Sequence, residues 1–193
     1  MLYSRLILAS GSPRRKELLA QLGFTFEVRS LAADESFPDT LRGQEISEYI
    51  CATKARAIAP SLSGDDLALT ADTVVCLNDL VLNKASDAEE AAQMLRMLSG
   101  KTHEVITSFA LVSQSETHIV SDITKVHFLP LREDDIANYI RSCKPFDKAG
   151  AYGIQEWIGL SAVERIEGSF YTVMGLPTHK VYPMLKERLR NPK

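Results

Sequence analysis

The segment Leu6-Ile-Leu-Ala-Ser-Gly-Ser-Pro-Arg-Arg-Lys16 joins an apolar run to the start of a helix through a turn of small residues. The run Leu6–Leu8 is typical of a short buried strand. Ser12 is a favourable N-cap and Pro13 suits the first helical position, so we predict a helix from Pro13 to about Leu22. The chain is therefore expected to begin with a strand that turns sharply into a helix.

This predicted helix begins with three consecutive cations, Arg14, Arg15 and Lys16. The N-terminus of a helix presents amide donors and a partial positive charge, which suits anions. Arginine adds a planar fork that matches phosphate oxygens, and Ser10 or Ser12 offers a hydroxyl donor. A phosphate site is one interpretation. The other is an ordinary N-cap followed by basic residues in solvent, and the residues alone leave both open.

Outward from this segment, helical and strand patterns alternate along the chain. We predict further helices over about 44–58, 87–98, 133–142 and 178–189, and strands over 24–28, 67–77, 80–82, 103–113, 117–129 and near 160–174. The strand 67–77 is expected to break near Asp72, and Ser86 with Glu89 fits a capping box. The runs 103–113 and 117–129 are expected to form a hairpin. The fold class is therefore α/β with a mixed sheet.

Composition narrows the class of protein. The 193 residues suit one large domain or two small lobes, and 45% hydrophobic with 24% charged residues is ordinary for a globular chain. A net charge of −3 gives no overall attraction for nucleic acid. Three cysteines without a CxxC spacing predict reduced thiols. With no apolar stretch of roughly 20 residues and no signal-peptide core, we expect no membrane partner and a cytoplasmic location.

Two acidic positions stand out. Asp72 lies inside the apolar run 67–77, where an unpaired carboxylate is costly to bury. It is therefore paired, hydrogen-bonded or functional, and the alternative is a turn or bulge residue bonded to backbone amides. Asp34 and Glu35 offer a second pair of carboxylates after a predicted strand, and the alternative for them is a solvated loop.

The remaining polar candidates are Lys54, Lys84 and the segment 148–155, although lysines are usually solvated. Glycines at 150 and 153 suit a close approach to a ligand. The histidines lack metal-binding spacing, and no GxSxG elbow occurs. Cations with carboxylates and no nucleophile elbow point to phosphate chemistry with a divalent metal, Mg²⁺ or Mn²⁺.

Seven motifs in order resemble the Maf family across essentially the whole chain. They are Ser10-Gly-Ser-Pro-Arg-Arg15, Asp34-Glu35, Lys54-Ala55, Ala71-Asp-Thr-Val74, Leu98-Ser-Gly100, Lys148-Ala-Gly-Ala-Tyr-Gly-Ile-Gln155 and Val173-Met-Gly-Leu-Pro177. The resemblance implies a single Maf-like domain over residues 1–193, with an ITPase-like two-lobed fold around a deep active-site cleft. It also implies a homodimer.

The activity that the resemblance implies is a nucleoside triphosphate pyrophosphatase. Such an enzyme cuts between the α and β phosphates with a divalent cation and releases a monophosphate and pyrophosphate. Members similar to this chain prefer dTTP and UTP, and sanitising modified nucleotides is a further expected role. A related subgroup prefers 7-methylguanosine triphosphate.

Site roles follow from the resemblance position by position. Asp72 is implied as the catalytic base, and Glu35 with Asp72 as metal ligands. The triphosphate would be held by Ser10, Arg14, Arg15, Lys54 and Lys84.

Specificity is implied at Arg14, Thr73 and Gln155, where the other subgroup tends to carry Trp, Gln and Glu. These three residues favour the dTTP/UTP subgroup. Glu156 and Trp157 depart from the Gly that is frequent after the glutamine, and this departure bears on the base pocket.

Two other classes of function compete with this interpretation. One is a nucleotide-binding regulator of cell division without catalysis, against which the intact set Arg14, Arg15, Asp72 and Lys84 argues. The other is a nucleic-acid-binding module, which the acidic balance and the few clustered aromatic residues disfavour.

Overall fold

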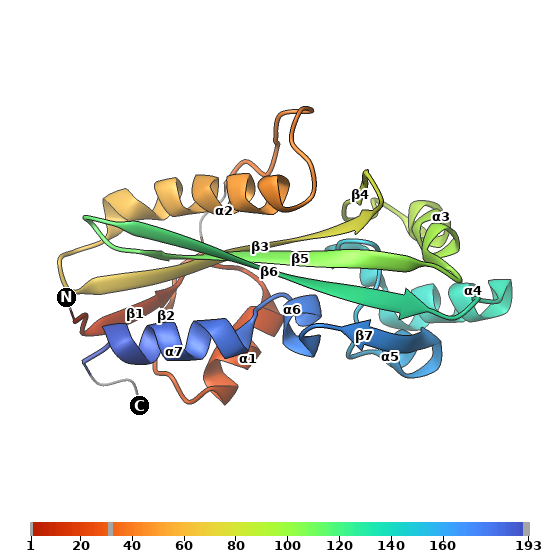
Figure 1. Cartoon of the computed structure of the whole chain (residues 1–193). Coiled ribbons are helices and arrows are strands. Elements are labelled where there is room, and N and C mark those ends of the chain that lie inside the picture. The colour runs from red at the N-terminus through yellow and green to blue at the C-terminus, as the bar shows by residue number, and fades with distance from the viewer. Residues whose placement is uncertain (1, 31–32, 191–193) are drawn as a thin grey trace. The chain divides into compact units, whose positions relative to one another are not determined.

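The computed structural model describes residues 2–30 and 33–190 (Figure 1). Strands and helices alternate along the chain. In order they are β1 (Arg5–Leu8), α1 (Pro13–Gln21), β2 (Glu27–Val28), α2 (Gln44–Ile58), the 3₁₀ turn η1 (Ala59–Ser61), β3 (Asp66–Leu77), β4 (Leu80–Leu82), α3 (Ala88–Leu98), β5 (Thr102–Val112), β6 (Thr117–Phe128), α4 (Glu133–Cys143), η2 (Pro145–Asp147), α5 (Trp157–Ala162), β7 (Val163–Glu167), α6 (Phe170–Met174) and α7 (Thr178–Arg188).

The chain divides into two compact units. Unit 1 contains 1–72, 107–122 and 175–193, and unit 2 contains 73–106 and 123–174. Strands β3, β5 and β6 contribute residues to both, and the strand order of the sheet is β2-β1-β3-β5-β6-β7 with β4 paired to β3. The predicted α/β class with a mixed sheet is confirmed, and the single domain over 1–193 stays a prediction.

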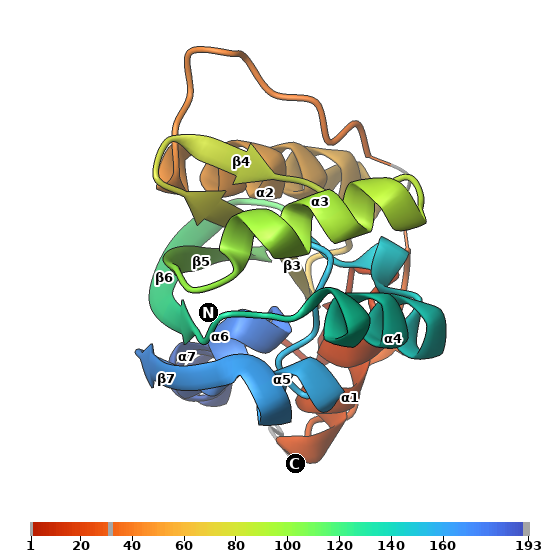
Figure 2. The ribbon, with the colours of Figure 1, turned by 90° about the vertical axis from the view of Figure 1, so that its right-hand side faces the viewer.

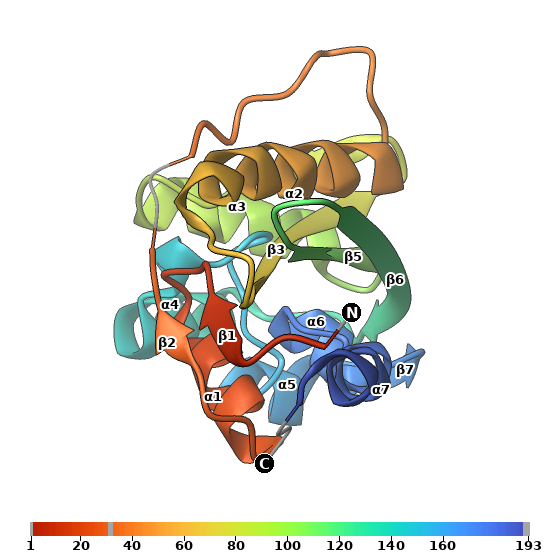
Figure 3. The ribbon, with the colours of Figure 1, turned by 90° about the vertical axis from the view of Figure 1, so that its left-hand side faces the viewer.

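Unit 1 is organised around parallel strands. The strand β1 lies between β2 and β3, with Ile7 opposite Glu27 on one side and Ala68 on the other (Figure 3). Ile7 and Ala68 belong to a buried apolar cluster with Cys51 and Ile58 of α2. This packing fixes α2 against the strands, and so places one face of that helix beside β3.

Unit 2 combines antiparallel pairings with a helical layer. The strand β4 pairs with the end of β3, and β7 pairs with the end of β6. Helix α3 packs against α4 (Figure 2). The core of this unit includes Leu95 and Leu98 of α3 and Tyr139 of α4, all of which are buried. A core of its own gives unit 2 a fixed frame for the loops that it carries.

Several predicted elements are confirmed. The helix over 44–58 has the predicted bounds, and the hairpin forms between β5 and β6. Helix α1 begins at Pro13, with the Ser12 side chain accepting the amide of Arg15, and the chain leaves it through Gly23 at a φ of 87°. These features depend on neighbours in sequence, which is why the local pattern predicts them.

Four predictions about secondary structure are wrong. The strand β3 runs without a break through Asp72. The predicted strand over 24–28 is reduced to Glu27–Val28, and only Val163–Glu167 is a strand in the region 160–174, between the helices α5 and α6. The cap of α3 is shifted by one residue, because Asp87 accepts the amide of Glu90 and the Glu90 carboxylate accepts from Ser86. Short apolar runs fit helix and strand equally well, so periodicity alone does not decide them.

Candidate active site

The turn between β1 and α1 gathers hydroxyl and cationic groups. Ser10 Oγ accepts the amide of Ser12 at 3.2 Å and a guanidinium nitrogen of Arg15, Nη1, at 3.4 Å. Ser12 Oγ in turn caps the helix by accepting the amide of Arg15 at 3.5 Å. The sequence therefore produces the N-cap and a cationic helix start, and the phosphate interpretation of this segment stays a prediction.

The Arg15 side chain is hydrogen-bonded to two segments of unit 1 that lie far apart in sequence, at Ser10 and at Gly175. Its Nε donates to the carbonyl oxygen of Gly175 at 2.8 Å, across 160 residues of chain. Loss of solvent on burial lowers the pKa of Arg15, and the charge of Asp72 opposes that shift. Arginine keeps its charge in proteins. The turn thus presents a fixed cation under the influence of the Asp72 carboxylate.

Lys54 lies between the two predicted functional carboxylates of unit 1. Its Nζ is 2.6 Å from Asp72 Oδ1 and 2.8 Å from Glu35 Oε1. The side chains of Lys54 and Asp72 are 16% and 11% exposed, whereas that of Glu35 is 46% exposed. The structure therefore brings together three residues that are separate in sequence and forms a cluster that opens to solvent on the Glu35 side.

The lysine explains why β3 continues through Asp72. A buried carboxylate is tolerated when it is paired and hydrogen-bonded. Helix α2 supplies that partner, because the apolar face containing Cys51 and Ile58 packs on the strands and leaves Lys54 beside β3. The alternative of a turn residue bonded to backbone amides is wrong for Asp72.

Asp34 and Glu35 do not act as a pair. Both carboxylate oxygens of Asp34 accept hydrogen bonds from Ser36, one from the amide at 2.9 Å and one from the hydroxyl at 2.8 Å. These bonds lower the pKa of Asp34. Asp34 therefore shapes the loop, and Glu35 alone of the two contacts Lys54.

Cys51 is a buried neighbour of this cluster that we did not single out from the sequence. Its thiol lies 3.5 Å from Thr70 Oγ1, and burial raises its pKa to about 11. A thiol with a raised pKa is a poor nucleophile at neutral pH. Cys51 is therefore a packing residue and not a nucleophile.

Three predicted site residues, Thr73, Lys84 and Gln155, lie in unit 2. Thr73 follows Asp72 on β3 and, because side chains alternate along a strand, projects to the opposite face. Lys84 is exposed, and its backbone forms an isolated bridge with Ala149. Gln155 is exposed on the loop before α5. Their roles stay predictions of the resemblance.

Gly150 has a packing role in this loop. A Cβ on Gly150 would lie 3.0 Å from the Val75 side chain, so Gly150 makes room for β3, and the approach of a ligand to the glycines stays a prediction. Lys148, which we expected in solvent, is buried between Asp147 and Glu156. Asp147 precedes this lysine directly, but Glu156 is distant in sequence and is brought to it only by the folded loop.

A divalent cation fits the donor chemistry of unit 1 in part. Mg²⁺ is usually held by one or two carboxylates together with substrate phosphates. Glu35 and Asp72 supply two such carboxylates around one ammonium group. Within residues 2–30 and 33–190 there is no cluster of three or more His, Cys, Asp or Glu side chains that could hold a metal. A metal here would therefore depend on oxygens from the substrate.

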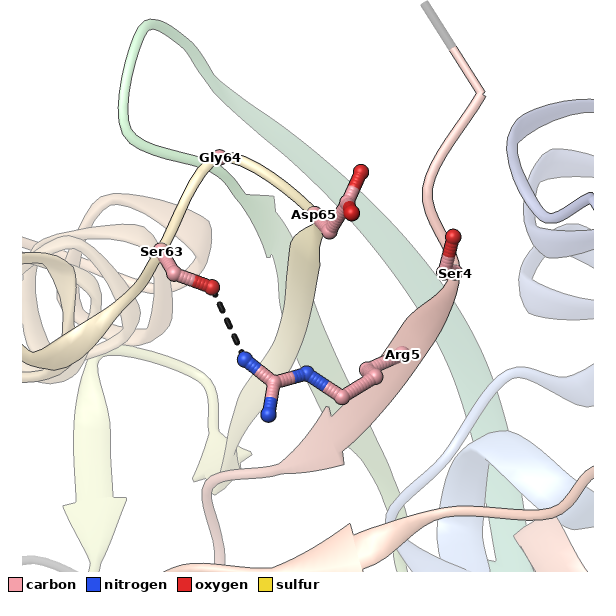
Figure 4. Close-up of a pocket in the computed structure, with 5 residues that line it drawn as sticks. All are labelled: Ser4, Arg5, Ser63, Gly64 and Asp65. Carbon is pink, nitrogen blue, oxygen red and sulfur yellow. Dashed lines mark hydrogen bonds between the residues drawn. The ribbon is translucent and has the colours of Figure 1, made fainter.

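A separate hollow of about 540 Å³ lies at the start of β3, lined by Ser4, Arg5, Ser63, Gly64 and Asp65 (Figure 4). Arg5 donates to Ser63 Oγ at 2.8 Å and pairs with Asp66 at 2.7 Å. Asp72 is six residues further along the strand, which corresponds to roughly 20 Å. The hollow is therefore distinct from the carboxylate cluster.

The fold and the charged cluster together define an α/β protein with a cationic helix start beside paired carboxylates. The family model described as "Maf-like protein" matches residues 5–188, and the chain belongs to this family.

Curated relatives cover nearly the whole chain. A dTTP/UTP pyrophosphatase of Phocaeicola vulgatus is 48% identical over 95% of this chain and 95% of its own length. A dTTP/UTP pyrophosphatase of Flavobacterium psychrophilum is also 48% identical, over 93% of this chain and 92% of its own length.

Two solved structures show weaker likeness. A nucleoside-triphosphatase (dITP/XTP pyrophosphatase) of Mycobacterium abscessus matches 64% of this chain and 74% of its own, with 20% identity and a TM-score of 0.40. The Ham1 protein of Staphylococcus aureus matches 65% and 72%, with 11% identity and a TM-score of 0.43. No helix within the described ranges is long and apolar enough to cross a membrane.

Proposed function

We propose that this chain hydrolyses dTTP and UTP to the nucleoside monophosphate and pyrophosphate. Membership of the Maf-like family and relatives named dTTP/UTP pyrophosphatase at 48% identity support this reaction. The observation that carries the proposal is the contact of Lys54 with both Glu35 and Asp72, in the same unit as Arg15 and Ser10. This unit combines cations that bind phosphate with carboxylates that accept protons.

In the proposed reaction, the start of α1 binds the triphosphate. The side chains of Arg14 and Arg15 are the donors, with Ser10 as an additional hydroxyl. Charge-assisted hydrogen bonds of this kind are roughly twice as strong as neutral ones. Lys54 lies close enough to the carboxylates to orient them and to contribute positive charge near the phosphates.

Asp72 is the proposed general base. Lys54 contacts its Oδ1, and a carboxylate has a second oxygen that can take a proton from water. Water then forms the new bond to phosphorus, the anhydride bond between the α and β phosphates breaks, and pyrophosphate leaves with the electron pair. The cations beside the phosphates stabilise the charge that develops on the leaving group.

A divalent metal, Mg²⁺ or Mn²⁺, completes the proposal. Glu35 and Asp72 would hold it together with phosphate oxygens. When bound, it would neutralise phosphate charge and lower the pKa of a coordinated water. Lys84 is proposed as a further phosphate ligand, and Arg14, Thr73 and Gln155 as the residues that set specificity. A cytoplasmic location, a homodimer and a role in sanitising modified nucleotides are proposed on the resemblance alone.

Product analysis tests the reaction. We expect purified protein with Mg²⁺ or Mn²⁺ to convert dTTP and UTP into monophosphate and pyrophosphate in equal amounts, as measured by ion-exchange chromatography. Diphosphate with orthophosphate would place the cut at the other anhydride and would contradict the proposal. Chelation by EDTA should abolish turnover, and unchanged turnover would contradict the metal requirement.

A further inference from the structure

A buried ion pair underlies the loop of unit 2 that carries Gln155. Lys148 Nζ lies 2.7 Å from Asp147 Oδ1 and 3.0 Å from Glu156 Oε1. The side chain of Lys148 is only 9% exposed and that of Glu156 is 22% exposed, whereas Asp147 is 57% exposed. Glu156 is therefore the partner that compensates the buried ammonium on the inner side of the loop.

The second oxygen of the same carboxylate continues the network. The hydroxyl of Tyr139 on α4 donates to Glu156 Oε2 and accepts the amide of Gly153 at 3.0 Å. Burial raises the pKa of Tyr139, and the hydrogen bond to Glu156 adds to this shift. The phenol is thus kept as a donor. Glu156 therefore connects Lys148 to Tyr139 of α4, and Tyr139 in turn is bonded to the loop backbone at Gly153.

Two glycines, Gly153 and Gly159, allow close packing around the turn that carries Gln155. The amide of Glu156 donates to the carbonyl of Gly153 at 2.9 Å and closes a turn around Gln155. A Cβ on Gly153 would lie 2.9 Å from Gln155 Nε2 and 2.9 Å from the Glu156 carboxyl carbon. A Cβ on Gly159 would lie 1.7 Å from the Ile154 carbonyl oxygen. The turn that presents Gln155 is therefore packed against α5, which follows it (Figure 2).

We propose that Glu156 is a positioning residue for base recognition, because its carboxylate holds Lys148 and Tyr139 and so fixes the turn that presents Gln155. This inference rests on the proposed function and concerns the base rather than the phosphates. An exposed glutamine on a freely moving loop would lose side-chain and backbone entropy on binding. The network removes part of that cost before the substrate arrives.

The choice of UTP against CTP is the sharpest test of this inference. The two substrates share the triphosphate and ribose and differ only at the base edge. Uracil presents a carbonyl and an N–H there, and cytosine presents an amino group and a ring nitrogen. The amide of Gln155 has one acceptor and two donor hydrogens, so its orientation decides which edge it matches. A displaced turn should therefore change the ratio of the two kcat/KM values.

The experiment measures kcat and KM for UTP and CTP with wild type, Glu156→Ala, Glu156→Gln and Tyr139→Phe. For Glu156→Ala we expect the UTP/CTP ratio of kcat/KM to fall about tenfold. This is smaller than the roughly hundredfold loss of rate that a 1 Å misplacement of a reacting group can cause, because the turn affects only the base contact. The change should be mainly in KM for UTP, since the base contact exists in both ground and transition states. Glu156→Gln keeps an acceptor for Tyr139 and should restore most of the ratio.

Controls separate positioning from folding. Glu133→Gln removes an exposed ion pair with Arg96 in the same unit and should leave the ratio at its wild-type value. Thermal melting reports the folding of each variant. If Glu156→Ala does not fold, Tyr139→Phe decides, because it removes the hydroxyl that joins Glu156 to Gly153 and preserves the ion pair with Lys148.

Two results would overturn the inference alone. One is a folded Glu156→Ala variant whose UTP/CTP ratio of kcat/KM is unchanged, which includes an equal loss of kcat/KM with both substrates. If Glu156→Ala does not fold, the same result with Tyr139→Phe overturns the inference. The other is a wild-type enzyme that hydrolyses UTP and CTP equally well. A wild-type protein that hydrolyses neither dTTP nor UTP would overturn the proposed function, and this inference with it.

Discussion

Lys54 in unit 1 and Lys148 in unit 2 each contact two carboxylates at hydrogen-bond distance, but the two clusters are connected differently. Around Lys54, one carboxylate belongs to a strand and the other to a half-exposed loop. Around Lys148, the inner carboxylate also accepts the hydroxyl of a buried tyrosine, which itself accepts a backbone amide. The inner carboxylate of the second cluster therefore has protein partners at both oxygens, whereas Lys54 contacts one oxygen of each carboxylate in the first cluster.

This difference shows that charge composition does not identify a site. A lysine between two acids stabilises a loop when the inner carboxylate is bonded to the protein through both oxygens. It becomes a candidate for chemistry when a further cation acts on the same carboxylate, as Arg15 does on Asp72. The expected effects of substitution should therefore separate, with activity affected most in unit 1 and folding affected most in unit 2.

The largest expected effect is that of Asp72→Asn. Asparagine keeps the shape and an oxygen for Lys54 but does not accept a proton, and loss of a general base typically costs on the order of 10²–10⁴ in rate. Asp147→Asn makes the same chemical change beside Lys148 and should leave kcat near wild type. Pyrophosphate release from dTTP measures both. Wild-type turnover in a folded Asp72→Asn variant would show that Asp72 is only structural.

An effect of intermediate size is expected when the pH is lowered, because protonation of the buried His103 should destabilise unit 2. His103 is buried, its Nε2 lies 2.7 Å from the hydroxyl of Tyr152, and its Nδ1 has no hydrogen-bond partner among the described residues. Burial lowers its pKa from 6.5 to about 4, with a smaller contribution from His127. The unfolded chain thus binds this proton at a higher pH than the folded chain. The contribution of neutral His103 to stability is complete above pH 6.5 and is lost as the pH falls toward 4.

The loss approaches a limit of about 3 kcal/mol, because each pKa unit corresponds to about 1.4 kcal/mol. Urea unfolding of wild type and His103→Gln across this pH range measures it. Glutamine can still bond to Tyr152 but does not titrate, so its unfolding free energy should depend less on pH. Parallel pH curves for the two proteins would contradict the prediction.

The smallest expected effects come from exchanging the two lysines for methionine. Lys148→Met leaves Glu156 without its ammonium and should lower the unfolding free energy by about 1.5–3 kcal/mol, the range for hydrogen bonds to charged groups. Lys54→Met should lower kcat/KM by a factor equivalent to about the same energy. It should change stability less, because Glu35 is half exposed and the charge of Arg15 also acts on Asp72. Denaturant unfolding and dTTP kinetics on both variants form a crossed test, and equal profiles would remove the distinction between the clusters.

Much of the fold could be predicted from local sequence. Ser12 and Pro13 define the start of α1, Gly23 its end, and the apolar spacing over 44–58 defines α2. The same holds for the hairpin, because two β-rich runs flank a short polar connection. Each of these features depends on residues within a few positions of one another, where periodicity and capping operate.

The candidate site could be predicted only in part. The cationic start of α1 and the unusual position of Asp72 are visible in the sequence, and the family resemblance assigns them roles. The contact of Lys54 with Glu35 and Asp72 is not visible, because the three residues lie on a helix, a loop and a strand. The burial of Lys148 was missed for the same reason, since Tyr139 and Glu156 come from different elements.

The α/β class, the cationic turn before α1, and the acidic and basic residues available for phosphate chemistry all follow from the amino-acid sequence. The carboxylates that each lysine contacts, the continuation of β3 through Asp72 and the mostly helical region 157–174 follow from the packing of the folded chain. Capping and periodicity act between neighbours in sequence. The pairing of buried charges instead depends on strand register and helix packing, which bring distant residues within about 3 Å of each other.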